Sequence, residues 1–207
     1  QFESNILKRI KYPDSMVICD MNCRNSAAHL LLADGSIASI DVEKSTIQAI
    51  TKLPYNFNTL TPHIYIDRDY RIWIYFAHGH EIFCYSTQKK EWISFTGQEK
   101  LYNEHCNITT LTDDNKGNIW IGTDNNGVII SQFSKKTYTQ LSKDFNSPYS
   151  LPCNHITSIY EDENNLMWIG TGKQGVSYTN LNKINIQNHP LPSQEDISSL
   201  FEDQKGN

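Results

Sequence analysis

The chain has 207 residues, with 18 lysines and arginines against 23 aspartates and glutamates, so its formal net charge is −5. This length is enough for one sizeable domain with its own core, and the acidic balance argues against nucleic-acid binding, which needs clustered positive charge. The longest apolar run, residues 72–77, is far shorter than the roughly 18–20 residues of a membrane span. The five cysteines are an odd number without zinc-finger spacing, so we expect free thiols and neither metal nor cofactor.

In chain order, the sequence begins with an apolar stretch at residues 6–12, which predicts a single outermost strand (unit 1–12). Residues 13–53 form the first and most diverged repeat unit, and residues 54–95 form a second unit around Trp73. Residues 96–141 and 142–190 form two units that align without a gap, with Trp120 and Trp168 48 residues apart. Residues 191–207 repeat the start of such a unit, so residues 197–202 predict one more innermost strand.

The third unit shows the strand pattern best. Short β-type stretches cover residues 108–112, 119–123, 128–133 and 137–141, with polar turns between them. An aspartate stands six residues before the tryptophan, as in Asp114 and Asp162, and we expect its carboxylate to bond the amides of the following turn. Three residues before the tryptophan stand Gly117 and Asn165, types that tolerate a left-handed backbone, whereas Tyr70 is the exception.

A period of 40–50 residues with four short strands per unit indicates an all-β fold, a β-propeller with four-stranded antiparallel blades. Successive side chains of a strand alternate between faces, so Trp120 and Gly122 share one face while Ile119 and Ile121 share the other. We expect the glycine to allow a close approach of the next blade beside the bulky indole ring.

Two segments resemble the two-component regulator propeller repeat: residues 114–123 followed by Gly127 and Val128, and residues 162–171 followed by Gly175 and Val176. The resemblance is strong over the second half of the chain and weaker around Trp73. It implies the extracytoplasmic, periplasmic sensor of a Bacteroidetes-type hybrid two-component regulator, whose full-length protein carries a histidine kinase. Many such sensors respond to oligosaccharides, so the resemblance also implies an oligosaccharide ligand and a non-catalytic role.

The repeats predict an incomplete ring of about four blades with single strands at each end, because the first and last units are partial. We therefore expect the chain to be a fragment of a longer protein. An open arc exposes apolar blade faces, which tend to be covered. The remaining blades and signalling domains of the same protein, or a homodimer through the open ends, are the expected partners, and nucleic acid is not.

Long connections rich in asparagine and aromatic residues indicate the candidate ligand surface, because amides bond sugar hydroxyls and rings cover the apolar sugar face. The alternative is that asparagines form turns and that aromatic side chains fill gaps between blades. The candidate ligand-binding residues are Tyr55, Phe57, His78, His80, Tyr102, His105, Asn125, Asn126, Tyr149, Lys173 and Gln174.

Catalytic motifs are missing from the sequence: it has neither a Gly-x-Ser-x-Gly elbow nor a phosphate-binding glycine loop. The acidic pairs such as Asp113-Asp114 recur in register with turns, which favours a role in the turn. His78 and His80 could approach a metal, but a divergent turn is the simpler interpretation. Two alternatives to a sensor stay open: a structural or dimerisation platform with the ligand site elsewhere, and a propeller-fold polysaccharide lyase or hydrolase.

Overall fold

The computed structural model describes residues 16–25, 27–41, 44, 46–54, 57, 61–77, 79–95, 106–133, 135–180, 183–190 and 196–200. The described residues form β-strands and turns and contain no helix. They therefore include no helical membrane span.

The described ranges contain sixteen strands, which fall into four sequential groups. Blade I contains β1 (Ile18–Arg24), β2 (Ala27–Leu32), β3 (Ser36–Asp41) and β4 (Thr46–Lys52). Blade II contains β5 (Thr61–Ile66), β6 (Arg71–Ala77), β7 (Ile82–Ser86) and β8 (Glu91–Ile93). Blade III contains β9 (Ile108–Asp113), β10 (Ile119–Thr123), β11 (Val128–Gln132) and β12 (Thr137–Leu141). Blade IV contains β13 (Ile156–Glu161), β14 (Leu166–Thr171), β15 (Gly175–Asn180) and β16 (Lys183–His189).

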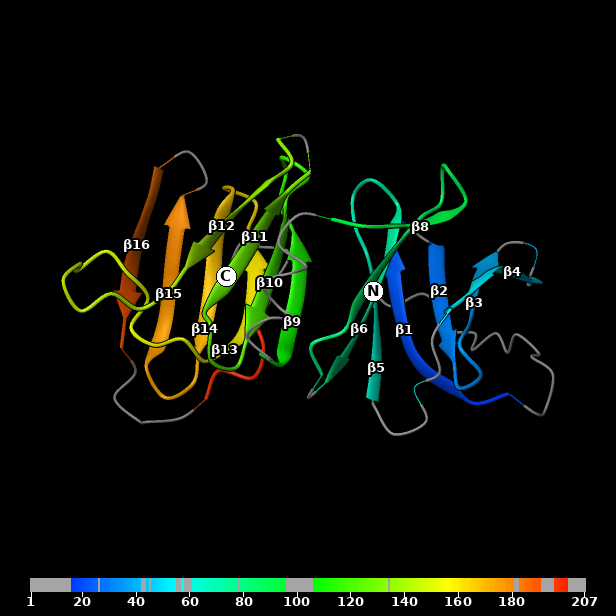
Figure 1. Cartoon of the computed structure of the whole chain (residues 1–207), viewed down its shortest axis with the longest axis horizontal. Helices are drawn as coiled ribbons and strands as arrows, with labels where there is room; N and C mark the ends of the chain where they lie inside the picture. The colour runs from blue at the N-terminus through cyan, green and yellow to red at the C-terminus, as the bar shows by residue number, and fades with distance from the viewer. Residues whose placement is uncertain are drawn as a thin grey trace, which may run out of the picture.

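Each blade is an antiparallel meander in which every strand pairs with its neighbour in sequence. One parallel bridge, Ala77 to Ile108, joins β6 to β9 and links the sheets of blades II and III. In Figure 1 blades I and II lie at the right and blades III and IV at the left, in chain order. The predicted all-β propeller architecture is confirmed, and the four strands predicted for blade III agree with the observed bounds to within one residue.

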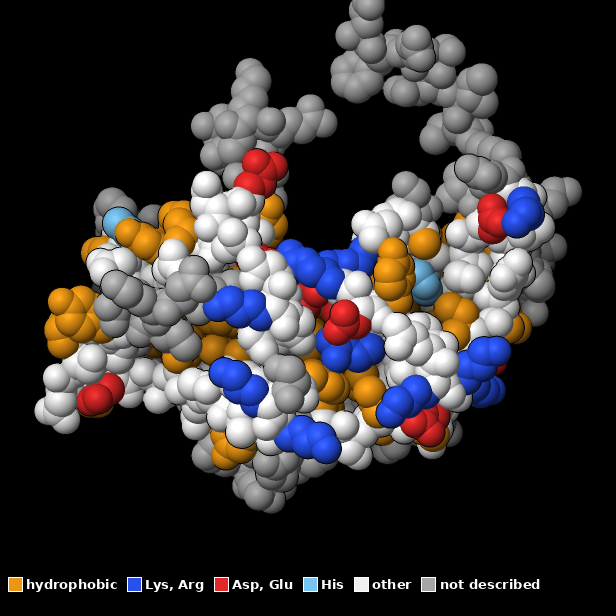
Figure 2. Space-filling model, turned by 90° about the horizontal axis from the view of Figure 1, so that it is seen from above, with side chains coloured by type: hydrophobic (Ala, Val, Ile, Leu, Met, Phe, Trp, Pro, Cys, Tyr) orange, Lys and Arg blue, Asp and Glu red, His pale blue; other side chains and the backbone are white. Residues whose placement is uncertain are grey.

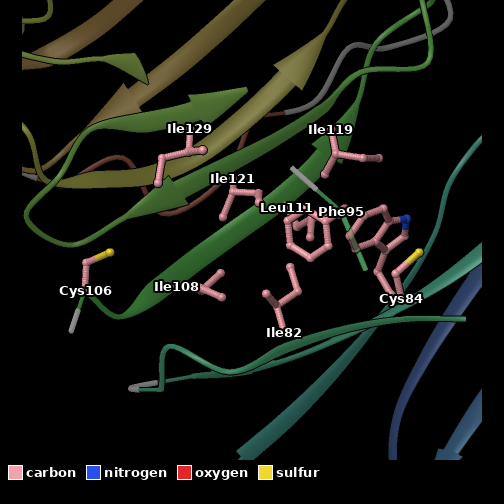
Figure 3. Close-up of a cluster of buried hydrophobic side chains, with 10 residues drawn as sticks. Ile82, Cys84, Phe95, Cys106, Ile108, Leu111, Ile119, Ile121 and Ile129 are labelled. Carbon is pink, nitrogen blue, oxygen red and sulfur yellow. The ribbon is translucent and has the colours of Figure 1, made fainter. Parts of the chain in front are cut away.

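The tryptophan and glycine of the repeat pack as the alternation predicts. Trp120 is 1% exposed and lies in one core cluster with Ile156 of blade IV. A Cβ added to Gly122 would lie only 2.6 Å from Cγ2 of Thr110 and 2.9 Å from Cγ2 of Ile156. On the other face, Ile119 and Ile121 pack with residues of blade II in a second cluster (Figure 3). The repeat therefore specifies how neighbouring blades stack.

The aspartate of the repeat has the predicted role and one more. Asp114 accepts hydrogen bonds from the backbone N–H groups of Lys116 and Asn118, both at 2.9 Å. Its other oxygen accepts a bond from Nε1 of Trp120 at 2.9 Å. The equivalent indole bonds are 2.7 Å long in blade II, from Trp73 to Asp67, and 2.8 Å long in blade IV, from Trp168 to Asp162. One carboxylate thus shapes the turn and satisfies a largely buried indole N–H.

The backbone at Tyr70 and the segment of residues 197–200 differ from the sequence-based expectations. Tyr70 adopts the same left-handed backbone, φ 57°, as Gly117 and Asn165, and its hydroxyl accepts a bond from Nδ2 of Asn25 at 2.8 Å, which ties blade II to blade I. Residues 197–200 are not a strand, although one was predicted. An innermost strand gains its ladder bonds from the second strand of its own blade, and the described residues contain no such partner. The predicted strand at residues 6–12 lies outside the described residues.

Candidate ligand-binding face

The meander topology sorts the connections onto two faces of the arc. Turns between strands one and two, and between strands three and four, lie at one end of the blades, and we name this end the 1–2 face. Connections between strands two and three, and from strand four to the next blade, lie at the other end, which we name the 2–3 face. The predicted ligand-binding residues that the structure describes lie in connections at the 2–3 face.

A braced turn in blade III carries two of the candidate asparagines. The Thr123 hydroxyl donates to the Gly127 carbonyl at 2.8 Å and accepts the Asn126 N–H at 2.9 Å. Gly127 has φ 73°, and a Cβ there would lie 2.1 Å from the Leu141 carbonyl oxygen, so only glycine fits. This geometry leaves Asn125 exposed at the tip of the turn, with Asn126 partly exposed beside it.

The connection from β12 to β13, residues 142–155, is the longest that the structure describes throughout. The Ser150 Oγ lies 2.9 Å from both the Asp144 and the Ser147 carbonyl oxygens, which share its single proton, and it accepts the Asp144 N–H at 3.0 Å. Leu151 is 1% exposed and packs in the core cluster shared by blades III and IV. Asn188 of β16 donates from Nδ2 to the Ser150 carbonyl at 3.1 Å. The loop is therefore closed on itself and anchored to blade IV.

This braced loop presents two aromatic rings to solvent. Phe145 is 89% exposed and Tyr149 is 56% exposed. The Lys143 ammonium lies over the Phe145 ring, 4.6 Å from its centroid. Exposed rings on a loop held by its own hydrogen bonds are pre-organised to stack on an apolar ligand face, because little side-chain and loop entropy is lost on binding.

Hydrogen bonds join the loop to the turns of both blades. Asn154 accepts the Gly127 N–H at its backbone carbonyl, at 2.9 Å, and the Lys143 N–H at its side-chain oxygen, at 2.6 Å. The His155 carbonyl accepts the Gly172 N–H at 2.9 Å. A Cβ on Gly172 would lie 2.5 Å from Nδ1 of His155, so the ring covers this glycine.

Seven predicted ligand-binding residues lie in described segments, and the structure separates them into three groups. Asn125, Asn126, Tyr149, Lys173 and Gln174 belong to the connected segments of blades III and IV. His80 belongs to the blade II turn, with Nε2 3.8 Å from a Glu81 oxygen. Phe57 is a core residue: it is 8% exposed and its ring centroid is 5.6 Å from that of Phe76, so it is not part of the exposed face. Tyr55, His78, Tyr102 and His105 lie outside the described residues.

Phe145 was not among the predicted residues, although it is the most exposed of the large hydrophobic side chains described. The usable signal was its place in a connection that has no counterpart of similar sequence in the other units. A repeat pattern marks the positions that recur between units, and Phe145 does not recur.

An ionic network occupies the inner strand ends at the 1–2 face. Asp113, which is 2% exposed, accepts bonds from the Tyr65 hydroxyl at 2.5 Å and the Arg68 backbone N–H at 2.7 Å. Arg24 of blade I reaches the same carboxylate at 3.3 Å, and Arg68 pairs with Glu161 of blade IV at 2.5 Å. The network therefore connects all four described blades.

Two members of the network, Tyr65 and Arg68, have raised pKa values. Burial, followed by the charge of Asp113, raises the pKa of Tyr65 to about 12. Burial opposes the charge on Arg68, but its hydrogen bond to Glu161 and the charge of Asp113 outweigh burial and raise its pKa. Asp113 and Glu161 were predicted to serve their turns. Instead, their main partners lie on other blades, and within these two acidic pairs Asp114 and Asp162 serve the turns.

The described residues contain no group of three or more histidine, cysteine, aspartate or glutamate side chains that could hold a metal ion. None of the five cysteines forms a disulfide: Cys84 and Cys106 are buried, Cys153 is partly buried, and Cys19 and Cys23 are exposed on β1. Burial raises the pKa of the Cys84 thiol well above its usual range, so this thiol is unreactive in the folded chain.

Comparison with protein families matches two segments of the chain, residues 104–125 and 150–173, to the family described as two component regulator propeller. These segments contain the innermost strand and the Asp-Trp turn of blades III and IV. No curated protein matches the sequence significantly.

Solved structures share the fold. The extracellular domain of a hybrid two-component system from B. thetaiotaomicron superposes with a TM-score of 0.64 at 18% identity, covering 91% of this chain and 24% of that chain. A second such domain from the same organism gives 0.63 at 16% identity, covering 92% and 26%. Virginiamycin B lyase from Staphylococcus aureus gives 0.61 at 15% identity, covering 84% and 55%.

This chain spans about a quarter of the length of the two sensor domains. At these identities the superpositions show a common propeller fold. The chain is therefore a β-propeller segment, two stretches of which match the two component regulator propeller family.

Proposed function

We propose that this chain is a ligand-recognising segment of the extracytoplasmic, periplasmic sensor of a hybrid two-component system, and that its ligand is a neutral oligosaccharide. The family match and the likeness to extracellular sensor domains support the sensor role. The single observation that carries the ligand class is the pair of exposed rings, Phe145 and Tyr149, on a braced loop beside an asparagine-bearing turn.

The acidic side chains of the repeat support a non-catalytic role. Asp113, Asp114 and Glu161 are largely buried and engaged in turn, indole or inter-blade bonds. A general acid or base must reach the substrate, and these groups face the protein interior. Signalling would instead require that the ligand bind two conformations of the sensor with different affinity.

Titration calorimetry against a panel of neutral oligosaccharides tests the proposal. It compares the wild-type chain, the F145A/Y149A variant and a Y138A control, which removes an exposed tyrosine of β12. The expected result is binding by wild type and control, and a Kd raised at least roughly tenfold by the double substitution. The same comparison of wild type, F145A/Y149A and Y138A is repeated with the complete extracytoplasmic region. If that region binds sugar equally with and without the substitution, the ligand site is elsewhere and this segment is a platform.

A related proposal concerns the open face of blade I. Met16, Val17, Ile18 and Met21, at or near β1, are between 43% and 66% exposed, which is unusual for large apolar side chains in adjacent positions. We propose that further blades of the same protein cover them. A concentration-dependent mass in analytical ultracentrifugation would instead indicate a homodimer through this face.

A further inference from the structure

Charge is distributed unevenly between the two faces of the arc. Of the lysines whose side chains the structure describes, six lie at the 1–2 face and are all exposed: Lys44, Lys89, Lys90, Lys116, Lys135 and Lys136. The other three, Lys52, Lys143 and Lys173, lie at the 2–3 face together with Asp34, Glu81, Asp124 and Asp144. Figure 2 views the 1–2 face and shows lysine and arginine side chains spread across it. An acidic protein therefore has one face with many exposed cations.

Many of the acids at the 1–2 face do not neutralise these lysines. Asp67, Asp113 and Asp114 are at most 2% exposed and are engaged in the indole and inter-blade bonds described above. Among the acids with more exposed side chains, Asp41 pairs with Lys44 at 3.0 Å in blade I. In blade II, Asp69 pairs with Arg71 at 3.0 Å and Glu91 lies 3.9 Å from Lys89. Blades II and III thus carry an excess of exposed positive charge at this face.

Two of the lysines occupy backbone positions that do not suit them. Lys90 has φ 58° and Lys136 has φ 52°, at equivalent turns between strands three and four of blades II and III. A left-handed backbone costs a non-glycine residue roughly 1–2 kcal/mol, and asparagine tolerates it better than lysine. Within the described residues neither ammonium group has an ion-pair partner. No ion pair within the described residues offsets the backbone cost of lysine at these two turns.

We propose that the 1–2 face of blades II and III docks on an anionic membrane surface. Lysine tips that do not converge on one point suit an extended charged surface, because each ammonium group acts as a hydrated point charge without fixed geometry. Two exposed tyrosines accompany them, Tyr70 at 45% and Tyr138 at 39%, and amphipathic aromatic rings favour the membrane–water interface. A single acidic glycan chain would require convergent charges, which this face does not offer. The proposal is independent of the oligosaccharide ligand assigned to the 2–3 face.

Vesicle co-sedimentation of the 207-residue chain tests the proposal. The lipids are phosphatidylcholine alone and phosphatidylcholine with phosphatidylglycerol, each at low and high sodium chloride. The test variant is K89Q/K90N/K135Q/K136N. The control, K52Q/K173N, changes lysines of the opposite face and includes a left-handed lysine, since Lys173 has φ 61°.

The expected result is binding of wild type and control to anionic vesicles only, weakened by salt, with the partition coefficient of the test variant reduced by roughly 100-fold. The asparagine substitutions should leave the thermal midpoint equal or higher, which separates lost binding from lost folding. Failure of wild type to bind anionic vesicles at low salt would overturn the proposal, as would equal binding by the test variant. Binding to soluble polygalacturonate but not to vesicles would overturn it in favour of an acidic polysaccharide.

Discussion

Replacing Asp114 by asparagine tests how much stability one carboxylate of the repeat supplies. Asp114 is fully buried and accepts four hydrogen bonds, from the N–H groups of Lys116 and Asn118, from Nδ2 of Asn118 at 2.8 Å and from Nε1 of Trp120. The oxygen Oδ1 bonds both backbone groups, so an asparagine can keep those two bonds. The new amide nitrogen Nδ2 of residue 114 would then face two donors, Nδ2 of Asn118 and Nε1 of Trp120. Each hydrogen bond lost at a buried donor costs about 1–3 kcal/mol. We expect the D114N variant to lose roughly 3 kcal/mol.

The matched substitution in blade IV should cost less. Asp162 accepts bonds from Asn164 N–H, Leu166 N–H and Nε1 of Trp168, so only one donor faces its Oδ2. Trp168 is partly exposed, whereas Trp120 is 1% exposed, and water can therefore replace the lost indole bond. We expect D162N to cost about 1 kcal/mol.

Urea unfolding followed by far-UV circular dichroism measures both values, provided that the m-value is unchanged between variants. Asp34→Asn serves as a control, because Asp34 is exposed and its partners, Ser36 and Lys52, are also accessible to water. Equal costs for D114N and D162N would refute the argument from burial, and a D114N cost as small as that of the control would refute the role of the carboxylate altogether.

Three further predictions concern other parts of the chain. G122A should destabilise the chain by about 2–3 kcal/mol, because the added Cβ would meet Thr110 and Ile156; urea unfolding should show that T110S recovers part of the loss. The raised pKa of Tyr65 means that the folded state favours the protonated phenol, so this contribution is complete below pH 10 and is lost as pH rises toward 12; the urea midpoint of wild type should fall more steeply over this range than that of Y65F, and parallel curves would contradict the assignment. In thiol labelling with a disulfide reagent, Cys19 and Cys23 should react within the folded chain and Cys84 and Cys106 only after unfolding; rapid reaction of all five would contradict the described burial.

The local repeat was predictable because its constraints lie within a few residues of each other. Strand bounds in blade III, the shared face of Trp120 and Gly122, and the turn role of Asp114 all follow from alternation and turn chemistry. The left-handed backbone of Tyr70 was not predictable from residue type, because its partner Asn25 is 45 positions away in sequence.

Contacts between blades were the main features that the sequence did not reveal. Arg24 and Asp113 are 89 positions apart, and no periodic pattern marks them as partners. The burial of Phe57 was missed for a similar reason: the side chain lies next to polar residues in sequence, yet its ring packs against Phe76. For the candidate site, the sequence predicted the loop of residues 143–153 and Tyr149 but not Phe145, because side-chain exposure depends on how Leu151 and Ser150 anchor the loop.

The most direct test of the central claim is a map of where sugar binds. Amide chemical shifts of the labelled chain, titrated with the oligosaccharide that binds best in calorimetry, report each backbone N–H separately. We predict shifts concentrated in residues 124–127, 143–155 and 172–175, which the described hydrogen bonds join into one surface. Shifts concentrated at the inner strand ends around Asp113 and Glu161, or an unchanged spectrum with a sugar that binds the complete extracytoplasmic region, would contradict it.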